Sequence, residues 1–528
     1  MEPSKTGAAH PKALAPANLV LTLVLSVLGA VIGMQMMASL GIVPSTSLIG
    51  ALAAMTLARV PLAMCRGFRS PHAQNLAQTS MSSATFGAAN SLFLPIGIPF
   101  LFGLPEMVVP MLVGVGLAML LDGWMLYRLF DTPIFPARNP WPLGIAAAEA
   151  IKAGDSGGRQ AHLLLAGLAL GLAGAALTLP MSAFGVALVG GWAAMAAFGC
   201  GLLAKAYAGT LLGVDLARIY LPHGMMIGAG LVALIQVGRL ILERRAAADT
   251  ASGAGAGAVA PAGASLRLGA LGYLAIMVLL AAGTGVYVGM APGMLVAFIL
   301  YGAAAAFVHE IIVGIAAMHA GWFPAFAVAL ITLLVGIGLG FPPPALVVLA
   351  GFSASTGPAF ADMGYDLKAG HLLRGVGADP AFERDGRRQQ TLAGMLGFGV
   401  AIVVVALSYK SFFANHLTAP IDAAYVAAIR AGISGETARA LALWAIPGAA
   451  LQWLGGSRRQ LGVLLATGLL IGNPWAGWMV AAGLLCRWAV HRSAGDAAKA
   501  RVEVFAGGVI AGDALYGFAS GLVRSLRK

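Results

Sequence analysis

The stretch ANLVLTLVLSVLGAVIGMQMMAS, residues 17–39, decides the class of fold, because it is predominantly apolar and contains no charged residue. About 20 helical residues of this kind cross the hydrocarbon core of a bilayer. Lys5 and Lys12 come before it, and the run is too long for the apolar region of a signal peptide. We therefore expect it to be the first membrane span, with the N-terminus in the cytoplasm.

The rest of the chain has the same character. It is 59% hydrophobic and 10% charged, with a mean hydropathy of +0.87, whereas soluble proteins carry roughly 25% charged residues. Long apolar runs recur along the sequence, and hydropathy gives about 14 to 16 candidate spans. The 72 glycines suit close helix packing in lipid. The sequence predicts an all-α polytopic integral membrane protein.

The net charge of +12 does not indicate a nucleic-acid partner. The arginines and lysines gather in the breaks between apolar runs, for example at Arg66 and Arg69, which is typical of cytoplasmic anchoring. The three cysteines, Cys65, Cys200 and Cys486, lie far apart and indicate neither a disulfide framework nor a metal site. We expect no metal ion and no cofactor.

An Ala/Gly-rich segment near the middle divides the chain. Residues 244–265, RRAAADTASGAGAGAVAPAGAS, have no apolar periodicity and are typical of a flexible linker. Each side of it carries a KAG triplet, then an RQ pair, then an apolar run. We expect a transmembrane half at 1–243, a linker at 244–266 and a second, related half at 267–528, as in many secondary transporters.

Three segments indicate broken helices. Residues 139–154, NPWPLGIAAAEAIKAG, form a helix too short to span, residues 91–105 hold three prolines, and residues 315–324 place a glycine and a proline inside an apolar run. Non-helical backbone at membrane depth is tolerated where it is buried or lines a cavity. Transporters bind their substrates at such breaks.

The pentapeptide GDSGG, residues 154–158, also surrounds the nucleophilic serine of trypsin-like proteases. Here it lies in a short polar connection between two helical segments, and Gly, Asp and Ser are ordinary turn residues. The fold class is wrong for such a protease, so we interpret Ser156 as a turn residue.

Four stretches together resemble the oligopeptide transporter (OPT) superfamily, which includes the yellow-stripe-like metal-chelate carriers. They are QNLAQTSMSSATFGAANSLFLP at 74–95, NPWPLGIAAAEAIKAG at 139–154, FADMGYDLKAGHLLRG with the later RRQQ from 360 to 390, and FAGGVIAGDALYGF at 505–518. The resemblance spans most of the chain. It implies a bacterial inner-membrane importer that couples the uptake of small peptides or metal–chelate complexes to protons.

Five acidic residues lie in or beside apolar stretches, and a charge in lipid is costly enough to make each a functional candidate. We predict proton-coupling roles for Glu149, Glu310 and Asp513. The alternatives are a helix-end pair of Glu149 with Lys152 and a structural hydrogen bond of Asp513 in its glycine-rich helix. The other two acids are Asp122, for which we expect a structural pair with Arg128, and Asp362.

Neutral polar residues complete the candidate site. Asn75, Gln78, Thr79 and Ser80 form a patch on one apolar span that can hydrogen-bond a peptide backbone, or equally join helices. His319 and Trp322 are candidates for substrate contact, or else an interfacial pair, since Trp favours the membrane boundary. His309–Glu310 begins an HExxH zinc motif, but Val313 replaces the second histidine.

Asp366 and Lys368 are expected to be gating or structural residues at a cytoplasmic end.

No Gly-x-x-x-x-Gly-Lys-Ser/Thr motif is present, so an ion gradient is the expected energy source. The prediction is a secondary active transporter working by alternating access, with a small-molecule substrate, protons and the bilayer as its partners. A membrane-embedded enzyme acting on lipid and a passive channel remain as alternatives. Peptide, metal chelate and other small zwitterions remain open as substrates, and a homo-oligomer remains open as the assembly.

Overall fold

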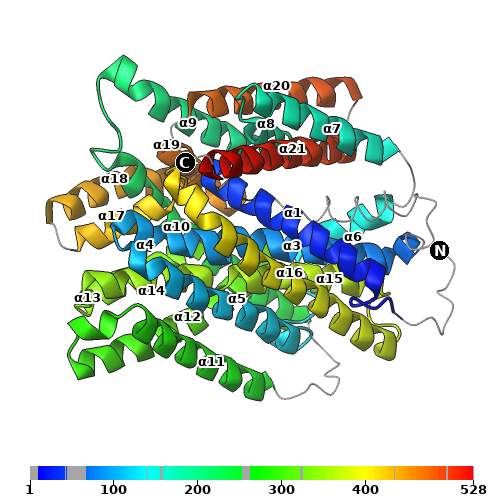
Figure 1. The fold of residues 1–528 in the computed structure, drawn as a ribbon, viewed down its shortest axis with the longest axis horizontal. Coiled ribbons are helices and arrows are strands. Elements are labelled where there is room, and N and C mark those ends of the chain that lie inside the picture. The colour runs from blue at the N-terminus through cyan, green and yellow to red at the C-terminus, as the bar shows by residue number, and fades with distance from the viewer. Residues whose placement is uncertain are drawn as a thin grey trace.

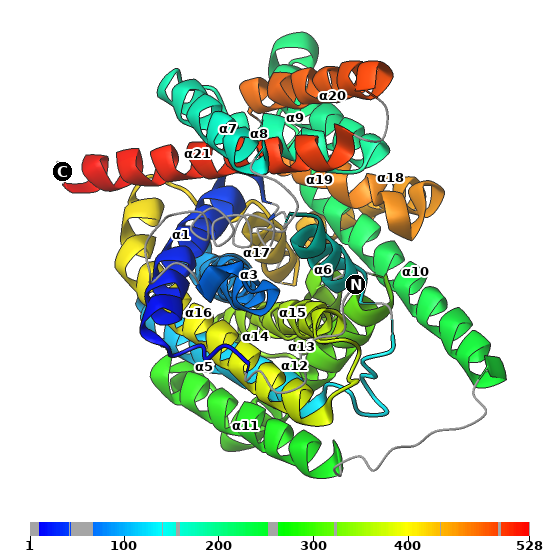
Figure 2. The same cartoon turned by 90° about the vertical axis from the view of Figure 1, so that its right-hand side faces the viewer.

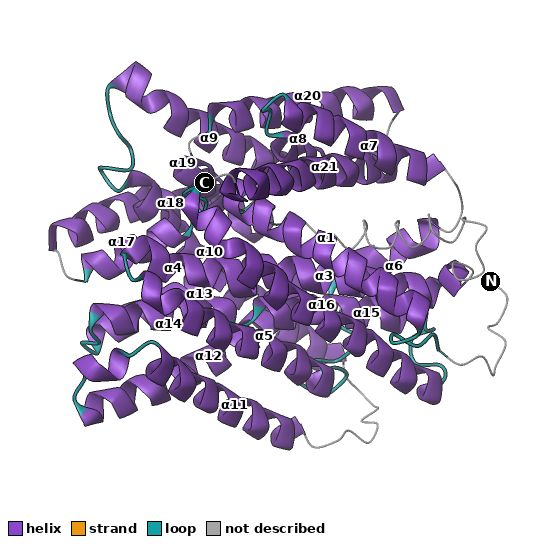
Figure 3. Cartoon of the chain, viewed as in Figure 1, coloured by secondary structure: helices purple, strands orange, loops and turns teal. Residues whose placement is uncertain are grey.

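The structure, a computed structural model, describes residues 10–41, 43, 67–139, 141–154, 159–251, 262–320, 325–432, 435–471, 473–494 and 498–526. These residues are largely helical, and Figure 3 shows the helices joined by loops. Within these ranges the β-type pairing is confined to one isolated bridge between Phe130 and Phe135. The predicted all-α class is confirmed.

Eight helical segments are long and apolar enough to cross a membrane. They are Pro16–Leu40, Pro71–Phe102, Pro105–Leu129, Trp192–Leu212, Gly263–Gly283, Pro292–His319, Pro343–Leu373 and Pro380–Ala414. Four shorter apolar helices accompany them in the described part of the chain. The chain is therefore a polytopic integral membrane protein.

The first part of the chain runs to the end of α10. Its elements are α1 (Pro16–Leu40), α3 (Pro71–Phe86), the π-helix η2 (Gly87–Phe93), α4 (Leu94–Phe102), the 3-10 turn η3 (Pro105–Met107), α5 (Val108–Leu129), α6 (Pro142–Gly154), α7 (Arg159–Ala176), α8 (Met181–Val189), α9 (Trp192–Leu212) and α10 (Leu221–Ala251). Proline stands in the first turn of several of these helices, where its missing N–H costs no helical hydrogen bond.

The second part begins after the predicted linker. Its elements are α11 (Ala262–Gly283), the 3-10 turn η4 (Val286–Gly289), α12 (Pro292–Ala320), α13 (Ala325–Gly338), α14 (Pro343–Ser355), α15 (Pro358–Leu373), α16 (Pro380–Ala414), α17 (Asp422–Ala431), α18 (Gly435–Arg459), α19 (Leu461–Ile471), α20 (Pro474–Ala494) and α21 (Lys499–Leu526). Helices α10 and α11 extend into the predicted linker from both sides, and residues 252–261 lie outside the described ranges.

The helices form two groups. In Figures 1 and 2, α7, α8, α9, α20 and α21 lie together above a larger bundle that contains α3, α5 and α14 to α16. Each group contains helices from before and from after the predicted linker.

Glycines allow close approach of α7 and α21. A Cβ at Gly167 would lie 2.1 Å from the Phe505 carbonyl oxygen, and a Cβ at Gly508 would lie 2.2 Å from the Leu164 carbonyl oxygen. The close helix packing that the many glycines suggest is thus found between α7 and α21.

The centre of the larger bundle is a broken helix pair, α14 and α15. Of the apolar window in Pro343–Leu373, 94% is buried, the highest fraction among the spans, so this pair lies inside the protein rather than against lipid. The break falls at Thr356 and Gly357, and Gly357 has φ +99°, a backbone conformation that favours glycine. The sequence pattern did not predict this break, although Gly357–Pro358 is a turn signal.

Other breaks follow the prediction. Helix α6 has 13 residues and is too short to span. Between α3 and α4 the chain stays helical but widens into the π-helix η2, just before Pro95 and Pro99, which have no N–H to donate to the preceding turn. The predicted break at 321–324 lies outside the described residues.

Candidate functional site

Helix α3 buries a polar face inside the protein. The side chains of Asn75, Gln78, Thr79 and Ser80 are all at most 1% exposed, and Ser82 and Ser83 continue the face by a further turn. The prediction located this patch. It faces other helices rather than lipid, so its polar groups must find partners within the protein.

The partners include two aspartates of α15. The Gln78 amide donates to the Asp366 carboxylate at 2.5 Å, and the Ser83 hydroxyl donates to its other oxygen at 3.4 Å. One turn earlier on α15, Asp362 accepts a hydrogen bond of 2.7 Å from the Ser82 hydroxyl. The second oxygen of Asp362 is buried and has no hydrogen-bond partner within the described ranges.

Helix α16 closes the cluster through Gln390, the last glutamine of the RRQQ segment. Its amide donates to the Thr79 hydroxyl at 3.0 Å and also to the backbone carbonyl of Asp366. We call the residues that link these three helices, Gln78, Thr79, Ser82, Ser83, Asp362, Asp366 and Gln390, the polar core.

A charged network lies at the end of the polar core. The Arg374 guanidinium donates to the Gln390 side-chain oxygen at 3.0 Å and to both oxygens of Glu383 at 2.8 and 3.1 Å. Arg374 and Glu383 are both buried, and the imidazole of His371 lies 3.4 Å from the same Glu383 carboxylate. Hydrogen bonds thus run without interruption from this ion pair to the backbone of Asp366.

The N-terminal segment covers this end. The ring of His10 lies 5.3 Å from the rings of both His72 and Phe382, measured between centroids. Burial, together with the nearby Arg374, lowers the pKa of His10 from 6.5 to about 4, although the hydrogen bond to the Pro11 carbonyl opposes the shift. His10 therefore lies against α3 and α16 as a neutral ring.

Lys368 shares α15 with the aspartates but binds elsewhere. Its ammonium donates to the Ala137 carbonyl at 2.7 Å, which ties α15 to the loop before α6. A Cβ at Gly144 of α6 would lie 2.4 Å from the Tyr365 carbonyl, so α6 packs closely on α15. This contact pattern favours the structural role predicted for Lys368.

The structure places the predicted proton-coupling residues on three different helices. Glu149 lies on α6, next to α15, but its side chain is outside the description. Asp513 of α21 accepts a hydrogen bond of 2.7 Å from the backbone N–H of Ser182 and so caps α8 in the other group of helices. Glu310 of α12 is fully buried. The described contacts place neither Glu310 nor Asp513 in the polar core.

The predicted pair of Asp122 with Arg128 is wrong. Asp122 is fully buried and accepts hydrogen bonds from the Tyr273 hydroxyl at 2.5 Å and from the Gly357 backbone N–H at 2.8 Å. Arg128 instead donates to Ser265 at 3.3 Å. The physical reason is helical geometry, since residues six positions apart lie on different faces of an α-helix.

One further predicted residue, His319, lies at the end of α12. His319 is half-buried in its last turn. Trp322 and Ser156 lie outside the described residues. Among the described residues, no group of three or more His, Cys, Asp and Glu side chains could hold a metal ion.

A central cavity of about 180 Å³ lies where helices are broken or end. Asn90 of the π-helix, Ala354 and Pro358 on either side of the α14–α15 break, and Tyr425 of α17 line it. At roughly 30 Å³ per water, it would hold about six water molecules. Ligand pockets are typically about 300–1,000 Å³, so the cavity as it stands is a constricted one.

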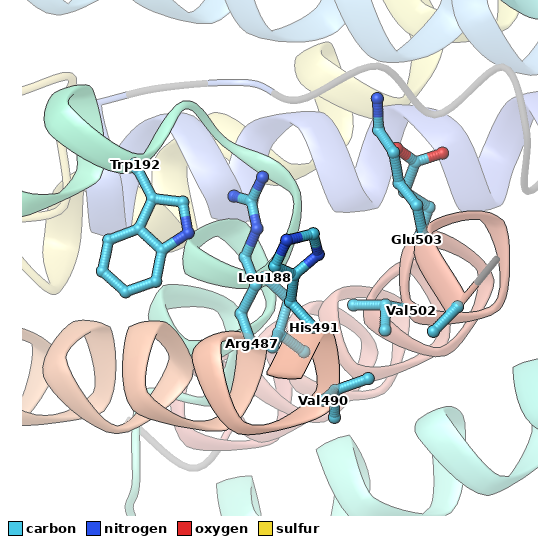
Figure 4. Close-up of a pocket in the computed structure, with 9 residues that line it drawn as sticks. Leu188, Trp192, Arg487, Val490, His491, Val502 and Glu503 are labelled. Carbon is cyan, nitrogen blue, oxygen red and sulfur yellow. The ribbon is translucent and has the colours of Figure 1, made fainter. Parts of the chain in front are cut away.

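Two other hollows lie away from this centre. Figure 4 shows one of about 260 Å³, in which Trp192, Arg487, His491 and Glu503 come from α9, α20 and α21. The other, of about 610 Å³, is an apolar groove between α1 and α16, lined for example by Val31 and Val400. Because neither is lined by the π-helix η2 or by the α14–α15 break, we do not assign the substrate to them.

Sequence reasoning missed several members of the site. Asp362 was recognised as an acid in an apolar stretch but not as a partner of α3, although its spacing of four residues from Asp366 indicates one helical face. Gln390 was quoted only as part of a motif. Outside the polar core, Asp422 of α17 is also fully buried, and a Cβ built on Gly97 would lie 2.0 Å from the Asp422 carboxylate. No sequence pattern indicated this burial, because the segment around Asp422 reads as a loop.

Comparison with known proteins agrees with the geometry. The family described as OPT oligopeptide transporter protein matches residues 14–243 and 220–523. No curated protein and no solved structure matches the chain. The stretches at 74–95 and 360–390, which carry the resemblance, meet in the polar core through α3, α15 and α16. The chain therefore belongs to the OPT oligopeptide transporter family.

Proposed function

We propose that this membrane transporter is a secondary active importer that couples the entry of small peptides or metal–chelate complexes to protons by alternating access. The observation that carries the proposal is the pair Asp362 and Asp366, two buried carboxyl groups one turn apart on α15. Their hydrogen-bond donors are the neutral side chains of Ser82, Gln78 and Ser83.

The surroundings of this pair favour a shared proton. Like charges at this spacing repel each other, and a buried charge without an opposite partner is costly. The cations nearest in sequence bind elsewhere. Lys368 donates to the Ala137 carbonyl, and Arg374 donates to Glu383 and Gln390. We infer that the pair holds at least one proton in this conformation. A group that gains and loses a proton inside the membrane is what proton coupling requires.

The broken helices support alternating access. The cavity between the π-helix and the α14–α15 break is lined by segments whose backbone departs from a regular helix. Transporters place their substrates at such segments, and parts of the protein move around the site. We propose that this cavity is the constricted form of the substrate site, which widens when the substrate enters.

The neutral polar group that lines the cavity favours a substrate that forms hydrogen bonds as a peptide backbone does. Asn90 lines the cavity, and its side chain donates to the Phe86 carbonyl at 3.5 Å, a bond long enough to be exchanged for a ligand. Such a group suits a peptide amide or the polar atoms of a chelate. Gln78 and Thr79 then act on the substrate indirectly, since Gln78 donates to Asp366 and Thr79 accepts from Gln390, which also binds the Asp366 backbone.

The orientation that fits best has the N-terminus in the cytoplasm of a bacterial cell, with the protein in the inner membrane. Lys12 pairs with Asp385 at 2.8 Å, and Arg374 and Arg387 lie at the same end through their contacts with Glu383. Cations gathered at one end are expected on the cytoplasmic side.

Uptake into proteoliposomes tests the proposal. The purified full chain should accumulate members of a labelled peptide panel or an iron–chelate panel when a pH gradient is imposed. Asp366→Asn, which mimics a permanently protonated group, should keep counterflow exchange but lose gradient-driven accumulation. Asp215→Asn, at an exposed loop position, is the matched control and should accumulate like the parent. Accumulation by Asp366→Asn equal to the parent would remove Asp366 as the coupling group.

A further inference from the structure

A second buried acidic cluster lies on another side of α15. Asp122 of α5, Tyr273 of α11 and Glu310 of α12 are all fully buried, and they come together where α15 begins. The phenyl groups of Phe307 and Phe352 pack around Tyr273 at 6.4 and 6.2 Å between ring centroids. Three polar side chains are thus enclosed by apolar ones, away from water that could hydrogen-bond to them.

The hydrogen-bond donors of the cluster serve Asp122. One of its oxygens accepts from the Tyr273 hydroxyl at 2.5 Å, and the other accepts from the backbone N–H of Gly357 at 2.8 Å. A carboxylate accepts such bonds without a proton of its own. It also lies at the N-terminus of α15, where the helix dipole stabilises a negative charge. Asp122 therefore fits as the ionised cap of α15.

Glu310 has no such support. Its carboxyl group interacts with Asp122 and Tyr273, yet neither oxygen has a hydrogen-bond partner of ordinary geometry in the described part of the chain. These two residues are the titratable groups that act on it from the surrounding helices. Its neighbour His309 faces α14, where the ring binds the Ser353 carbonyl. An ionised Glu310 would be a buried anion beside another anion, without a cation.

We propose that this cluster is a second proton site, with the proton on Glu310, a negative charge on Asp122, and the Tyr273 hydroxyl between them. The use of this proton in transport rests on the function proposed above. The site is distinct from the polar core, because Asp122 holds the backbone of Gly357, whereas Asp362 and Asp366 face α3.

The arrangement provides a route for moving the proton. Tyr273 can pass its hydroxyl proton to Asp122 while its oxygen takes the proton of Glu310. The balance is one proton moved from Glu310 to Asp122, with Tyr273 unchanged. Asp122 then loses its charge and its hold on Gly357 weakens. Ala354 and Pro358 flank this break and line the central cavity, so the position of the proton is linked to the shape of the cavity.

Infrared spectroscopy of the full chain in lipid tests the assignment without any substrate. The spectrum of Glu310→Gln minus that of the parent at neutral pH should show the loss of a protonated carboxyl band. Asp122→Asn minus the parent should show the loss of carboxylate bands instead. Glu436→Gln, at an exposed position on α18, is the matched control and should leave the protonated band unchanged.

The opposite result for Glu310→Gln, a loss of carboxylate bands, would overturn the proposal. If this variant does not fold, labelling the eight glutamates with ¹³C in the parent chain gives the same answer. A protonated band that shifts with the label supports the proposal, and the absence of a shifted band contradicts it. Because these spectra need no transport, a failure here is distinguishable from a failure of proton-coupled uptake.

Discussion

Gln78 donates a 2.5 Å hydrogen bond to Asp366, across 288 positions of sequence. The contact joins two stretches that resemble the same transporter family, and it provides a buried carboxyl group with a neutral donor. A neutral donor leaves the charge of Asp366 free to change, whereas an arginine or lysine in its place would favour the ionised form. This relationship is the structural basis for assigning the proton to α15.

Removing the Gln78 amide should weaken the polar core. Gln78→Ala leaves one oxygen of Asp366 without its donor, and an unsatisfied buried group costs about 1–3 kcal/mol. We expect a lower unfolding temperature in detergent and slower gradient-driven uptake. Ser83→Ala removes only the longer bond of 3.4 Å and serves as the milder comparison. Equal effects of the two variants would contradict the importance given to the Gln78 bond.

Glycine at position 97 is predicted to be essential for packing α4 against α17. A Cβ there would lie 2.0 Å from the carboxylate of the buried Asp422. Gly97→Ala should therefore lose about 1–3 kcal/mol of stability, the usual cost of overpacking. Gly209→Ala on α9 meets nothing within 4 Å and should be neutral or slightly stabilising. Thermal unfolding of the two variants in the same detergent measures the difference.

The buried His10 makes stability depend on pH. Its pKa in the folded protein is about 4, below the ordinary value of 6.5, because burial disfavours the charged ring. The unfolded chain therefore binds the proton first, and this contribution to stability is lost as the pH falls from about 6.5 toward 4. His10→Gln should flatten the fall in unfolding temperature over this range. His162→Gln, on an exposed position of α7, should not change it.

Glu149 remains a prediction that its own variant can test. Helix α6 is short and packs on α15, so a proton carried by Glu149 would move close to the polar core. If Glu149 is the coupling group, Glu149→Gln should exchange substrate but not concentrate it. Concentrative uptake by Glu149→Gln, together with its loss in Asp366→Asn, would assign coupling to α15 instead.

The sequence predicted those parts of the fold that depend on local pattern. Apolar runs identified the membrane class, and the short helix α6 followed from its length. The polar patch on α3 was visible because neutral polar residues are uncommon in an apolar span. Each of these features is a property of one stretch of chain.

The parts of the fold and of the site that the sequence did not predict depend on contacts between stretches far apart in the chain. The partner of Asp122 is Tyr273, 151 positions away, and no local pattern distinguishes it from the nearby Arg128. The pairing of Asp362 with Ser82 spans 280 positions in the same way. Asp422 was missed because alanine-rich surroundings read as a loop until the packing against Gly97 is known.

Substrate-driven proton movement tests the central claim most directly. Proteoliposomes that contain a trapped pH-sensitive dye and no imposed gradient receive substrate from outside. The account predicts that the lumen acidifies as the substrate enters, and that Asp366→Asn admits substrate only by exchange, without acidification. Entry of substrate into parent liposomes without any change in internal pH would contradict proton coupling.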